Sequence, residues 1–363
     1  MRICKNQFSK PGKGLLVVLS VMAAVTLLLS ACHSHDDVHQ EEIIGWAAGN
    51  ASGGFGTIFH TKNGGLDWER QGDATMIPNA DLNDIRAVNK YTVWAVGESE
   101  GGVPVILKTE DGGRTWVRQG TGSGLPDAAL SGVCPLNDNI CWAAGLHGTI
   151  LKTTDGGSNW TALKASNDYA GAYQMIAAAD ENHVWAVGEG DTKAMIHYTS
   201  DGGLTWERQG TDSLTTDNMP NALIDIHAAN LNYVWTVGPS QAVYTLDGGK
   251  TWVNKPTPVA FYHNNGVCVV NDHVVWVATD DNLIFKLTQL NGDWVHQTSP
   301  AGALPAMYMG ITATDENTAW ITTNTYTNGG QILHTGDGGK TWVIQDTPED
   351  ISLRRITFVG AKR

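Results

Sequence analysis

The chain has 363 residues, of which 37 are acidic and 23 are basic, so its formal net charge at pH 7 is −14. A negative surface repels a phosphate backbone, which argues against nucleic acid as a partner. The same charge argues against attachment to anionic lipid through a basic surface.

Residues 1–31 have the composition of a bacterial lipoprotein signal peptide. Four basic residues precede the apolar run 14–29, and Leu29-Ser30-Ala31-Cys32 follows as a lipobox. Cleavage before Cys32 would make it the first residue of the mature chain, with lipid on its sulfur. An uncleaved membrane helix is the alternative.

The residue after Cys32 predicts the destination of the exported protein. His33 stands there rather than Asp, which by Gram-negative sorting rules favours the outer membrane in a host that has one. We therefore expect an exported protein that is lipid-anchored to the cell envelope. Removal of residues 1–31 takes away four basic and no acidic side chains, so the mature charge becomes about −18.

Residues 32–43 are predicted to form a flexible tether between the lipidated cysteine and the first repeat. Within it, residues 33–42 place three histidines among four carboxylates, a composition that binds transition metals loosely. Nothing in the sequence sets a ligand geometry, so we predict a solvated spacer and no metal.

Tryptophan spacing defines the architecture of residues 44–363. The chain has fourteen tryptophans, and they form a two-per-repeat pattern that recurs seven times at intervals of roughly forty to fifty residues. The first tryptophan of each pair follows or interrupts a short apolar run; these are Trp46, Trp94, Trp142, Trp185, Trp235, Trp276 and Trp320. This period suits one four-stranded propeller blade, and no helical periodicity competes with it. We predict an all-β, seven-bladed β-propeller.

The second tryptophan of most repeats ends the turn motif Ser/Thr-x-Asp-Gly-Gly-x-Thr-Trp, with Asp111, Asp155, Asp201, Asp247 and Asp337 at its acidic position. An aspartate in a tight turn accepts hydrogen bonds from nearby main-chain N–H groups, and the glycines permit positive φ. We therefore assign these aspartates a structural role. An EF-hand calcium loop would need further oxygen ligands that are absent here.

Two cysteines flank a turn between the first two strands of one repeat. Alignment on the tryptophans pairs Cys134 with Cys141, just as it pairs Arg86 with Val93, so we predict a disulfide between cross-strand neighbours. Cys268 has no such partner and is expected to be a small buried apolar residue.

The two ends of the repeat region are complementary. The first repeat starts at Ile44 without the strand that precedes tryptophan in the other repeats, whereas 353–359 matches 82–88. The C-terminal strand should therefore complete the first blade and close the ring, which removes two exposed sheet edges.

A candidate ligand rim lies in the loops that lead into the inner strands and in those that follow the Trp-Ala-Val-Gly runs, opposite the Asp-Gly-Gly turns. The sequence varies most there, and we select Tyr173, Tyr262, His263, Asn264, Tyr308 and Tyr326. Aromatic, amide and imidazole groups suit contact with protein or glycan. The alternative is that several of these side chains plug the channel.

The turn motif resembles the Asp-box, or BNR repeat, of sialidases, sortilin-type receptors and some xyloglucan hydrolases. A sialidase is disfavoured because the Arg-Ile-Pro motif is missing, and because Arg70, Arg118 and Arg208 recur on outermost strands. A glycoside hydrolase needs two carboxylates across a cleft. Loop acids are present, namely Asp127, Asp168, Asp217 and Asp280, so hydrolysis or glycan binding stays as the alternative function.

At the level of whole repeats, 148–157 with Trp142-Ala143-Ala144-Gly145 upstream resembles the photosystem II stability and assembly-factor family over 44–363. The resemblance implies a non-catalytic propeller that holds a membrane-protein subunit during assembly and uses no cofactor. The acidic chain lacks the Arg-rich patch of photosynthetic members. We therefore expect a binding protein whose partner is an envelope or membrane protein, and we do not predict photosystem II as that partner.

Overall fold

The computed structural model describes residues 42–121, 124–165, 171–189, 194–210, 222–259, 263–325 and 329–360. The chain divides into two units, Met1–Glu41 and Glu42–Arg363, and every strand belongs to the second. The predicted signal peptide, Cys32 and the tether up to residue 41 lie outside the described residues. Within the described ranges, no helix has the length and apolarity needed to span a bilayer.

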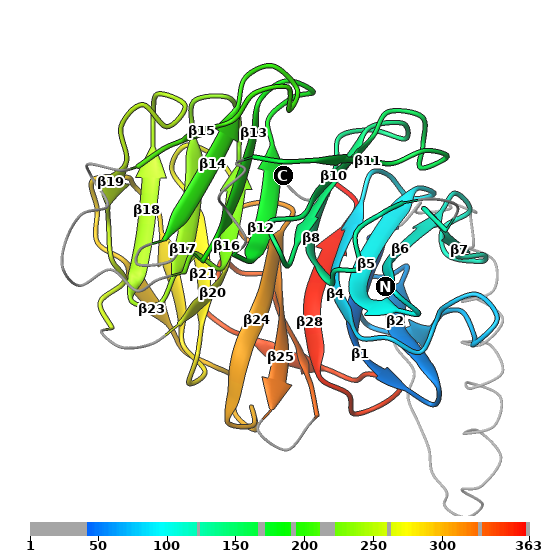
Figure 1. The fold of residues 1–363 in the computed structure, drawn as a ribbon. Helices are drawn as coiled ribbons and strands as arrows, with labels where there is room; N and C mark the ends of the chain where they lie inside the picture. Colours follow the sequence, from blue (N-terminus) through cyan, green and yellow to red (C-terminus); the bar gives the residue numbers. More distant parts are fainter. Residues whose placement is uncertain are drawn as a thin grey trace, which may run out of the picture. The chain divides into compact units, whose positions relative to one another are not determined.

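Seven antiparallel four-stranded sheets make up this second unit, which confirms the predicted propeller (Figure 1). From inner to outer strand, blade 1 contains β28 (Leu353–Phe358), β1 (Gly45–Ser52), β2 (Phe55–Thr61) and β3 (Glu69–Arg70). Blade 2 contains β4 (Leu82–Ala87), β5 (Val93–Glu100), β6 (Val103–Thr109) and β7 (Val117–Arg118). Blade 3 contains β8 (Leu130–Pro135), β9 (Cys141–Gly145), β10 (Ile150–Thr153) and β11 (Thr161–Leu163).

The remaining blades repeat this order. Blade 4 contains β12 (Tyr173–Ala178), β13 (Val184–Gly188), β14 (Met195–Thr199) and β15 (Glu207–Arg208). Blade 5 contains β16 (Asp225–Ala228), β17 (Val234–Gly238), β18 (Gln241–Thr245) and β19 (Val253–Asn254). Blade 6 contains β20 (Asn264–Val269), β21 (Val275–Thr279), β22 (Ile284–Leu287) and β23 (Val295–Gln297). Blade 7 contains β24 (Ala306–Ala313), β25 (Ala319–Thr325), β26 (Ile332–Thr335) and β27 (Val343–Gln345).

The inner strands form a closed circle around a central channel. Each contacts the inner strand of the next blade, and β28 contacts both β24 and β4. Because β28 pairs antiparallel with β1 from Gly45↔Phe358 to Gly49↔Leu353, the C-terminal strand completes blade 1 as predicted. The sheet edges that an open ring would expose are therefore covered.

The first tryptophan of each repeat lies on the second strand of its blade and has no exposed surface. In most blades its ring meets, edge to face, an aromatic ring of the next blade, as Trp94 meets Trp160 with centroids 5.7 Å apart. Burial of about 200 Å² of tryptophan surface contributes on the order of 5 kcal/mol gross, an upper bound. These interfaces between blades are the hydrophobic core.

Each of these tryptophans also faces one residue of the third strand in its own blade, and that residue is aromatic or a lysine. In blade order these partners are His60, Lys108, Lys152, Tyr198, Tyr244, Lys286 and His334. The three lysines lie over the tryptophan rings with Nζ between 4.4 and 4.9 Å from a ring centroid. Cation–π contacts thus replace ring stacking in blades 2, 3 and 6.

A second set of contacts joins every blade to the next. In each case a side-chain nitrogen donates to the carbonyl of the first glycine in the next Asp-box turn, at 2.7 to 3.2 Å. The seven pairs are Gln71–Gly112, Lys108–Gly156, Lys152–Gly202, Gln209–Gly248, Lys255–Gly292, Lys286–Gly338 and Gln345–Gly64. We call these contacts the junction bonds.

The Asp-box turns are closed by their own side chains. In blade 4, Asp201 Oδ1 accepts hydrogen bonds from the Thr199 hydroxyl and the Thr205 N–H, and Oδ2 accepts from the Thr205 hydroxyl. Thr199 Oγ1 in turn accepts from the Gly203 N–H. The turns around Asp111, Asp155, Asp247 and Asp337 repeat this pattern, so these carboxylates fasten turns and are not presented to a ligand.

The predicted disulfide is contradicted by the strand register. Cys134 lies opposite Trp142, and Cys141 lies opposite Pro135, so the alignment used for the prediction was shifted by one residue. Since successive side chains point to opposite faces of a strand, the two thiols enter different interfaces. Cys141 packs with Trp94, whereas Cys134 packs near Trp142. No disulfide joins them.

Candidate functional site

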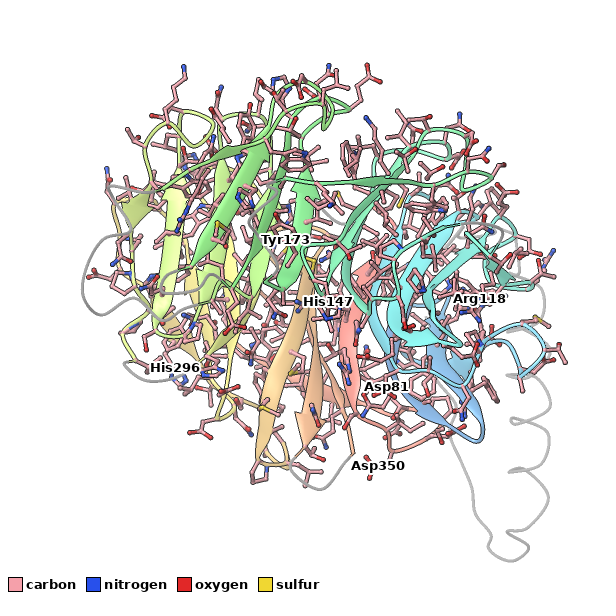
Figure 2. All side chains as sticks on the ribbon, in the orientation of Figure 1. Asp81, Arg118, His147, Tyr173, His296 and Asp350 are labelled. Atoms are coloured by element: carbon pink, nitrogen blue, oxygen red, sulfur yellow. The ribbon has the colours of Figure 1, made fainter. Side chains whose placement is uncertain are left out.

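Three of the predicted rim residues are buried inside the propeller. Tyr173, Asn264 and Tyr308 have no exposed surface. The Tyr173 hydroxyl lies 2.5 Å from His197 Nδ1, and the Tyr308 hydroxyl donates to Ser299 Oγ at 3.1 Å. Figure 2 shows Tyr173 in the interior, whereas Arg118 belongs to the outermost strand of its blade. These side chains therefore stabilise the blades and offer no surface to a ligand.

The side-chain amide of Asn264 is likewise hydrogen-bonded within the protein. Its nitrogen donates to the carbonyls of Gly238 and Gln241, and its oxygen accepts from the Thr257 hydroxyl. Of the predicted rim, His263 is exposed, with Nδ1 4.0 Å from Asp280 Oδ2. Tyr262 and Tyr326 lie outside the described residues.

The residues that do face the channel mouth come one position later in the sequence. Near the start of the inner strand, six of the seven blades have a register shift that leaves an extra residue opposite the second strand. We call the residues at this position, and their equivalent in blade 5, the bulge ring: Asn83, Ser131, Gln174, Ile224, Asn265, Met309 and Arg354. Bulges commonly re-aim side chains next to functional sites.

The bulge ring surrounds a cavity of about 280 Å³ at the end of the channel away from the Asp-boxes. Asn83, Ser131, Gln174, Ile224, Met309 and Arg354 line it, with Arg355 at its base. All six of these bulge-ring residues are half-buried. The cavity is small, polar around most of its edge and open to solvent, so it can receive one or two side chains of a partner.

Arg354 is held in place by residues of blades 1 and 2. Its Nε donates to Asn50 Oδ1 at 3.0 Å, and its terminal nitrogens donate to Asn83 Oδ1 at 2.7 Å and Asp81 Oδ2 at 3.0 Å. These hydrogen bonds fix the guanidinium at the mouth, and most of its N–H groups donate within the protein.

Arg355 extends into the channel and ties blade 1 to blades 5, 6 and 7. It donates to the carbonyls of Asn265 and Met309, and its other terminal nitrogen lies 3.8 Å from Asp225 Oδ1. Asp225 also accepts from the Val267 N–H at 2.9 Å. In the same way Asp84 accepts from the Val133 N–H at 2.9 Å. Two inner-strand aspartates thus bind the main chain of the next blade.

These two carboxylates do not form the acid pair of a glycoside hydrolase. Burial raises the pKa of Asp84, against the charges of Arg86 and Arg355, which lower it. Each aspartate accepts one hydrogen bond from the next residue of its own strand and one from the next blade, and neither lines the mouth cavity. Among the loop acids, Asp127 accepts from the Ser99 hydroxyl and Asp280 from Asn265. Asp168 and Asp217 lie outside the described residues.

The sequence carried a signal for the bulge ring. Leu82, Leu130, Leu223 and Leu353 align with Tyr173, Asn264 and Tyr308, so the selected positions correspond to buried leucines in four blades. Glycine follows the bulged residue in blades 3, 6 and 7, as expected where the chain bends and another backbone approaches closely. A Cβ at Gly266, for example, would lie 2.8 Å from the Met309 carbonyl oxygen.

Comparison with known proteins gives matches to photosystem II assembly factors, both from a family model and from a curated relative. A family model described as "Photosynthesis system II assembly factor YCF48" matches residues 79–216 and 213–356. A curated relative, the Photosystem II assembly protein Ycf48 of Synechococcus sp. (strain JA-2-3B'a(2-13)), is 26% identical over 201 residues. That match covers 52% of this chain and 54% of the relative, so it spans about half the length of each.

Two solved structures share the fold. One is described as YCF48 bound to D1 peptide; it is 19% identical with a TM-score of 0.56, covering 73% of this chain and 82% of that one. The other, YCF48 from Cyanidioschyzon merolae, is 18% identical with a TM-score of 0.57, covering 75% and 88%.

Proposed function

Since this chain belongs to the photosystem II assembly factor YCF48 family, we propose that it is a non-catalytic, lipid-anchored propeller that holds a segment of a membrane-protein partner across the bulge ring. The family model supports the binding role, and the structure of a relative described with a D1 peptide supports a polypeptide ligand. The partner of this chain is an envelope protein that it helps to assemble.

The bulge ring is the observation that carries the proposal. It brings amide, hydroxyl, thioether and guanidinium groups from different blades to one half-buried rim. Amides and hydroxyls can donate to and accept from a peptide backbone, while Met309 and Ile224 supply an adaptable apolar contact. The rim therefore suits a chain segment laid over the channel.

The lipobox supports the location. A lipid on Cys32 would hold the propeller at a membrane surface, and residues 33–43 would set its distance from that surface. A tethered protein meets membrane-bound partners at a raised effective concentration, so a modest affinity at the mouth suffices. Replacement of Cys32 by Ser should release the protein from the membrane fraction.

The experiment is a crosslinked pull-down of the lipidated protein from its native membranes. The test variant carries Gln174→Ala together with Met309→Ala, and the control carries Tyr91→Ala, an exposed aromatic on the Asp-box side. We expect a specific membrane-protein partner with wild type and control and its loss in the test variant. Equal recovery with all three proteins would place binding elsewhere, and no protein partner combined with retention on polysaccharide would favour the glycan-binding alternative.

A further inference from the structure

The first residues that the structure describes lie on the Asp-box face of the propeller, opposite the bulge ring. Ile43 forms a parallel bridge with Asn63, and its carbonyl accepts from the Gly64 N–H at 2.8 Å, both in the Asp-box turn of blade 1. Glu42 Oε2 lies 4.0 Å from Nζ of Lys90, on the turn between the first two strands of blade 2. The chain that precedes Glu42 is therefore joined to the propeller at this face.

The length of that preceding chain limits how the propeller can sit on a membrane. At about 3.5 Å per residue, the ten residues 33–42 reach at most about 35 Å from a lipidated Cys32, in any conformation. The eight residues of β1 place the bulge ring about 25 Å from the Asp-box face, at about 3.3 Å per residue. A mouth turned toward the bilayer would require the chain to pass β2 and β3, at about 4.8 Å each, and then this height, which uses the whole reach. The opposite orientation needs no such extension.

The tips of the Asp-box turns carry no carboxylate. The residue after the glycine pair is exposed in the six blades whose turns have that pair, and blade 6 lacks an equivalent. These tips are two leucines, three cations and one serine, namely Leu66, Leu204, Arg114, Lys250, Lys340 and Ser158. Leu66 is 74% exposed and Leu204 is 85% exposed. A lipid interface takes up leucine side chains and favours Lys and Arg beside them, which matches this set.

Other exposed apolar side chains gather on the same face. Within the described ranges, the large apolar residues exposed there, besides the two leucine tips, are Ile43, Tyr91, Leu231 and Leu246. On the bulge-ring side they are Leu146 and Leu304. Single exposed apolar residues are ordinary on a protein surface, but six on one face against two on the other indicate a contact surface at the Asp-boxes.

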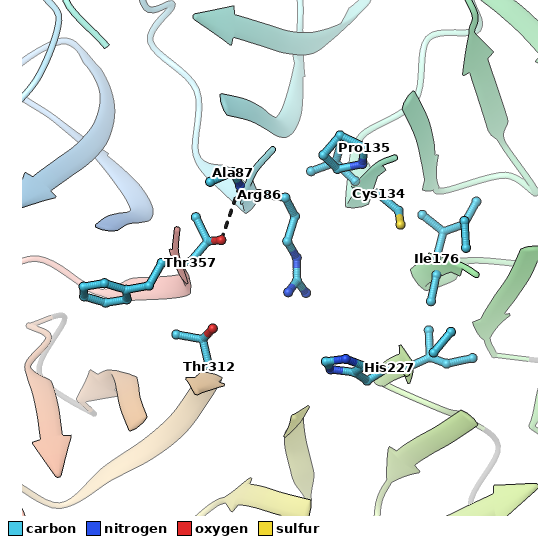
Figure 3. A pocket seen from close by; sticks show the side chains of 14 residues that line it. Arg86, Ala87, Cys134, Pro135, Ile176, His227, Thr312 and Thr357 are labelled. Carbon is cyan, nitrogen blue, oxygen red and sulfur yellow. Dashed lines mark hydrogen bonds between the residues drawn. The ribbon is translucent and has the colours of Figure 1, made fainter. Parts of the chain in front are cut away.

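The Asp-box end of the channel is too narrow for a polypeptide. Its cavity has a volume of about 60 Å³ and is lined by the last residues of the inner strands. Arg86 extends from β4 into the middle of this space (Figure 3). Since a water molecule in the liquid takes about 30 Å³, the space holds roughly two waters and not a segment of chain. A partner segment therefore enters the channel from the bulge-ring end.

We infer that the Asp-box face lies on the lipid surface that holds the anchor, with Leu66 and Leu204 in the interface and the cationic tips beside the headgroups. The inference rests on the proposed lipid anchor and adds an orientation, in which the bulge ring opens away from the bilayer at about 25 Å from it. The hairpin turns nearer the channel carry Asp138 and Glu316, so zwitterionic lipid suits this face better than anionic lipid. The partner segment is then a loop or tail that extends well beyond the membrane surface.

The test compares how close two labels lie to the membrane. The purified lipidated protein is reconstituted on phosphatidylcholine vesicles that carry a nitroxide quencher on the headgroup. A fluorophore is attached at Ser158→Cys, on an Asp-box tip, or at Leu304→Cys, on the bulge-ring side; both positions are exposed. The protein without these substitutions, labelled in parallel, corrects for its own thiols. We expect quenching of the label at position 158 and full emission from the label at position 304.

A double variant tests the lipid contact itself. Leu66→Gln with Leu204→Gln should reduce the quenching at position 158 by roughly half or more, because the apolar contact with the interface is lost. Val117→Gln with Val343→Gln changes two exposed valines of the outermost strands and should leave the quenching unchanged. An effect of equal size in both double variants would overturn the proposed contact, and so would unchanged quenching in the leucine variant.

Co-flotation of the same samples with the vesicles separates the anchor from the orientation. If the protein floats but both labels are quenched equally, or the label at position 304 is quenched more, the orientation is wrong and the anchor stands. If the wild-type protein does not float, the lipid anchor is refuted and this orientation with it. Flotation with selective quenching at position 158 would support the proposal.

Discussion

Lys108 Nζ lies 3.0 Å from the Gly156 carbonyl oxygen, and this contact joins the third strand of blade 2 to the Asp-box of blade 3. A contact of the same kind exists at each of the seven junctions. Lysine of the third strand supplies the donor in blades 2, 3 and 6, and Gln or Lys after the outer tryptophan supplies it elsewhere. A donor from the third strand and a donor that follows the outer tryptophan thus make the same contact with the Asp-box of the next blade.

Loss of one junction bond should therefore destabilise the whole ring. Lys108 is 5% exposed and also donates to the Asp138 carbonyl. Lys108→Met keeps the apolar stem but leaves both carbonyls without this donor, so we expect the free energy of unfolding to fall by about 2 kcal/mol. Urea denaturation measures it. Lys250→Met, at an exposed Asp-box position, should change the value by less than about 0.5 kcal/mol.

The Asp-box carboxylates should make the protein sensitive to strong acid. Hydrogen bonds from the Thr205 hydroxyl and N–H and from the Thr199 hydroxyl lower the pKa of Asp201 to about 2, against 3.8 for the unperturbed group. Because the folded pKa is depressed, the stabilisation is complete above pH 3.8 and is lost as the pH falls through 2. Urea midpoints measured from pH 5 to 2 should fall less steeply in Asp201→Asn than in wild type.

A histidine should add a second pH dependence at milder acidity. Burial, with a smaller effect from the charge of Arg208, lowers the pKa of His197 to about 4 from 6.5. The unfolded chain takes up a proton below pH 6.5, whereas the folded protein does so only near pH 4. Stability should therefore decrease by about 2 kcal/mol as the pH falls through this window, a value that allows for solvent screening. His197→Gln should remove this dependence; an unchanged pH profile in the variant would contradict the assignment.

Closure of the ring should depend on one aromatic contact. The Phe358 ring stacks on Trp320 with centroids 3.7 Å apart and is 2% exposed, which joins blade 1 to blade 7. Phe358→Ala should cost about 3 to 5 kcal/mol of unfolding free energy, since a buried aromatic is replaced by a cavity. Phe55→Ala, in the same blade but half-buried, should cost clearly less.

The cysteines give a simple check on the register. Cys134 and Cys141 enter opposite faces of blade 3, so a disulfide would require the strands to shift. We expect the thermal unfolding midpoint to be the same with and without reductant. A drop on reduction would show that the two thiols are bonded in the native protein.

The sequence predicts the scaffold well because each repeat contains residues with one structural role. A tryptophan such as Trp94 fits only at a blade interface, and a turn such as 109–116 closes in only one way. The matching of 353–359 with 82–88 likewise predicted the closing strand. Periodicity therefore sufficed for strand order and for closure.

Periodicity did not suffice to predict the register between paired strands. A bulge inserts one residue, so it inverts which side chains face the channel on one side of it, and the glycine that follows it in blades 3, 6 and 7 is absent from the other blades. This explains why Tyr173, Asn264 and Tyr308 were selected for the rim when Gln174, Asn265 and Met309 occupy the bulge positions. The one-residue error for Cys134 and Cys141 has a different source. The prediction paired Cys134 with the residue before the tryptophan, whereas the structure pairs it with Trp142 itself.

The position of β28 also imposes an order in time. Blade 1 receives its inner strand from residues 353–358, whereas its other strands come from 45–70. During synthesis, β1 can pair at once with β2, but it emerges about 300 residues before β28, its partner on the inner side. The early blades therefore spend that interval as an open arc, and the last strand to emerge is the one that turns the arc into a ring.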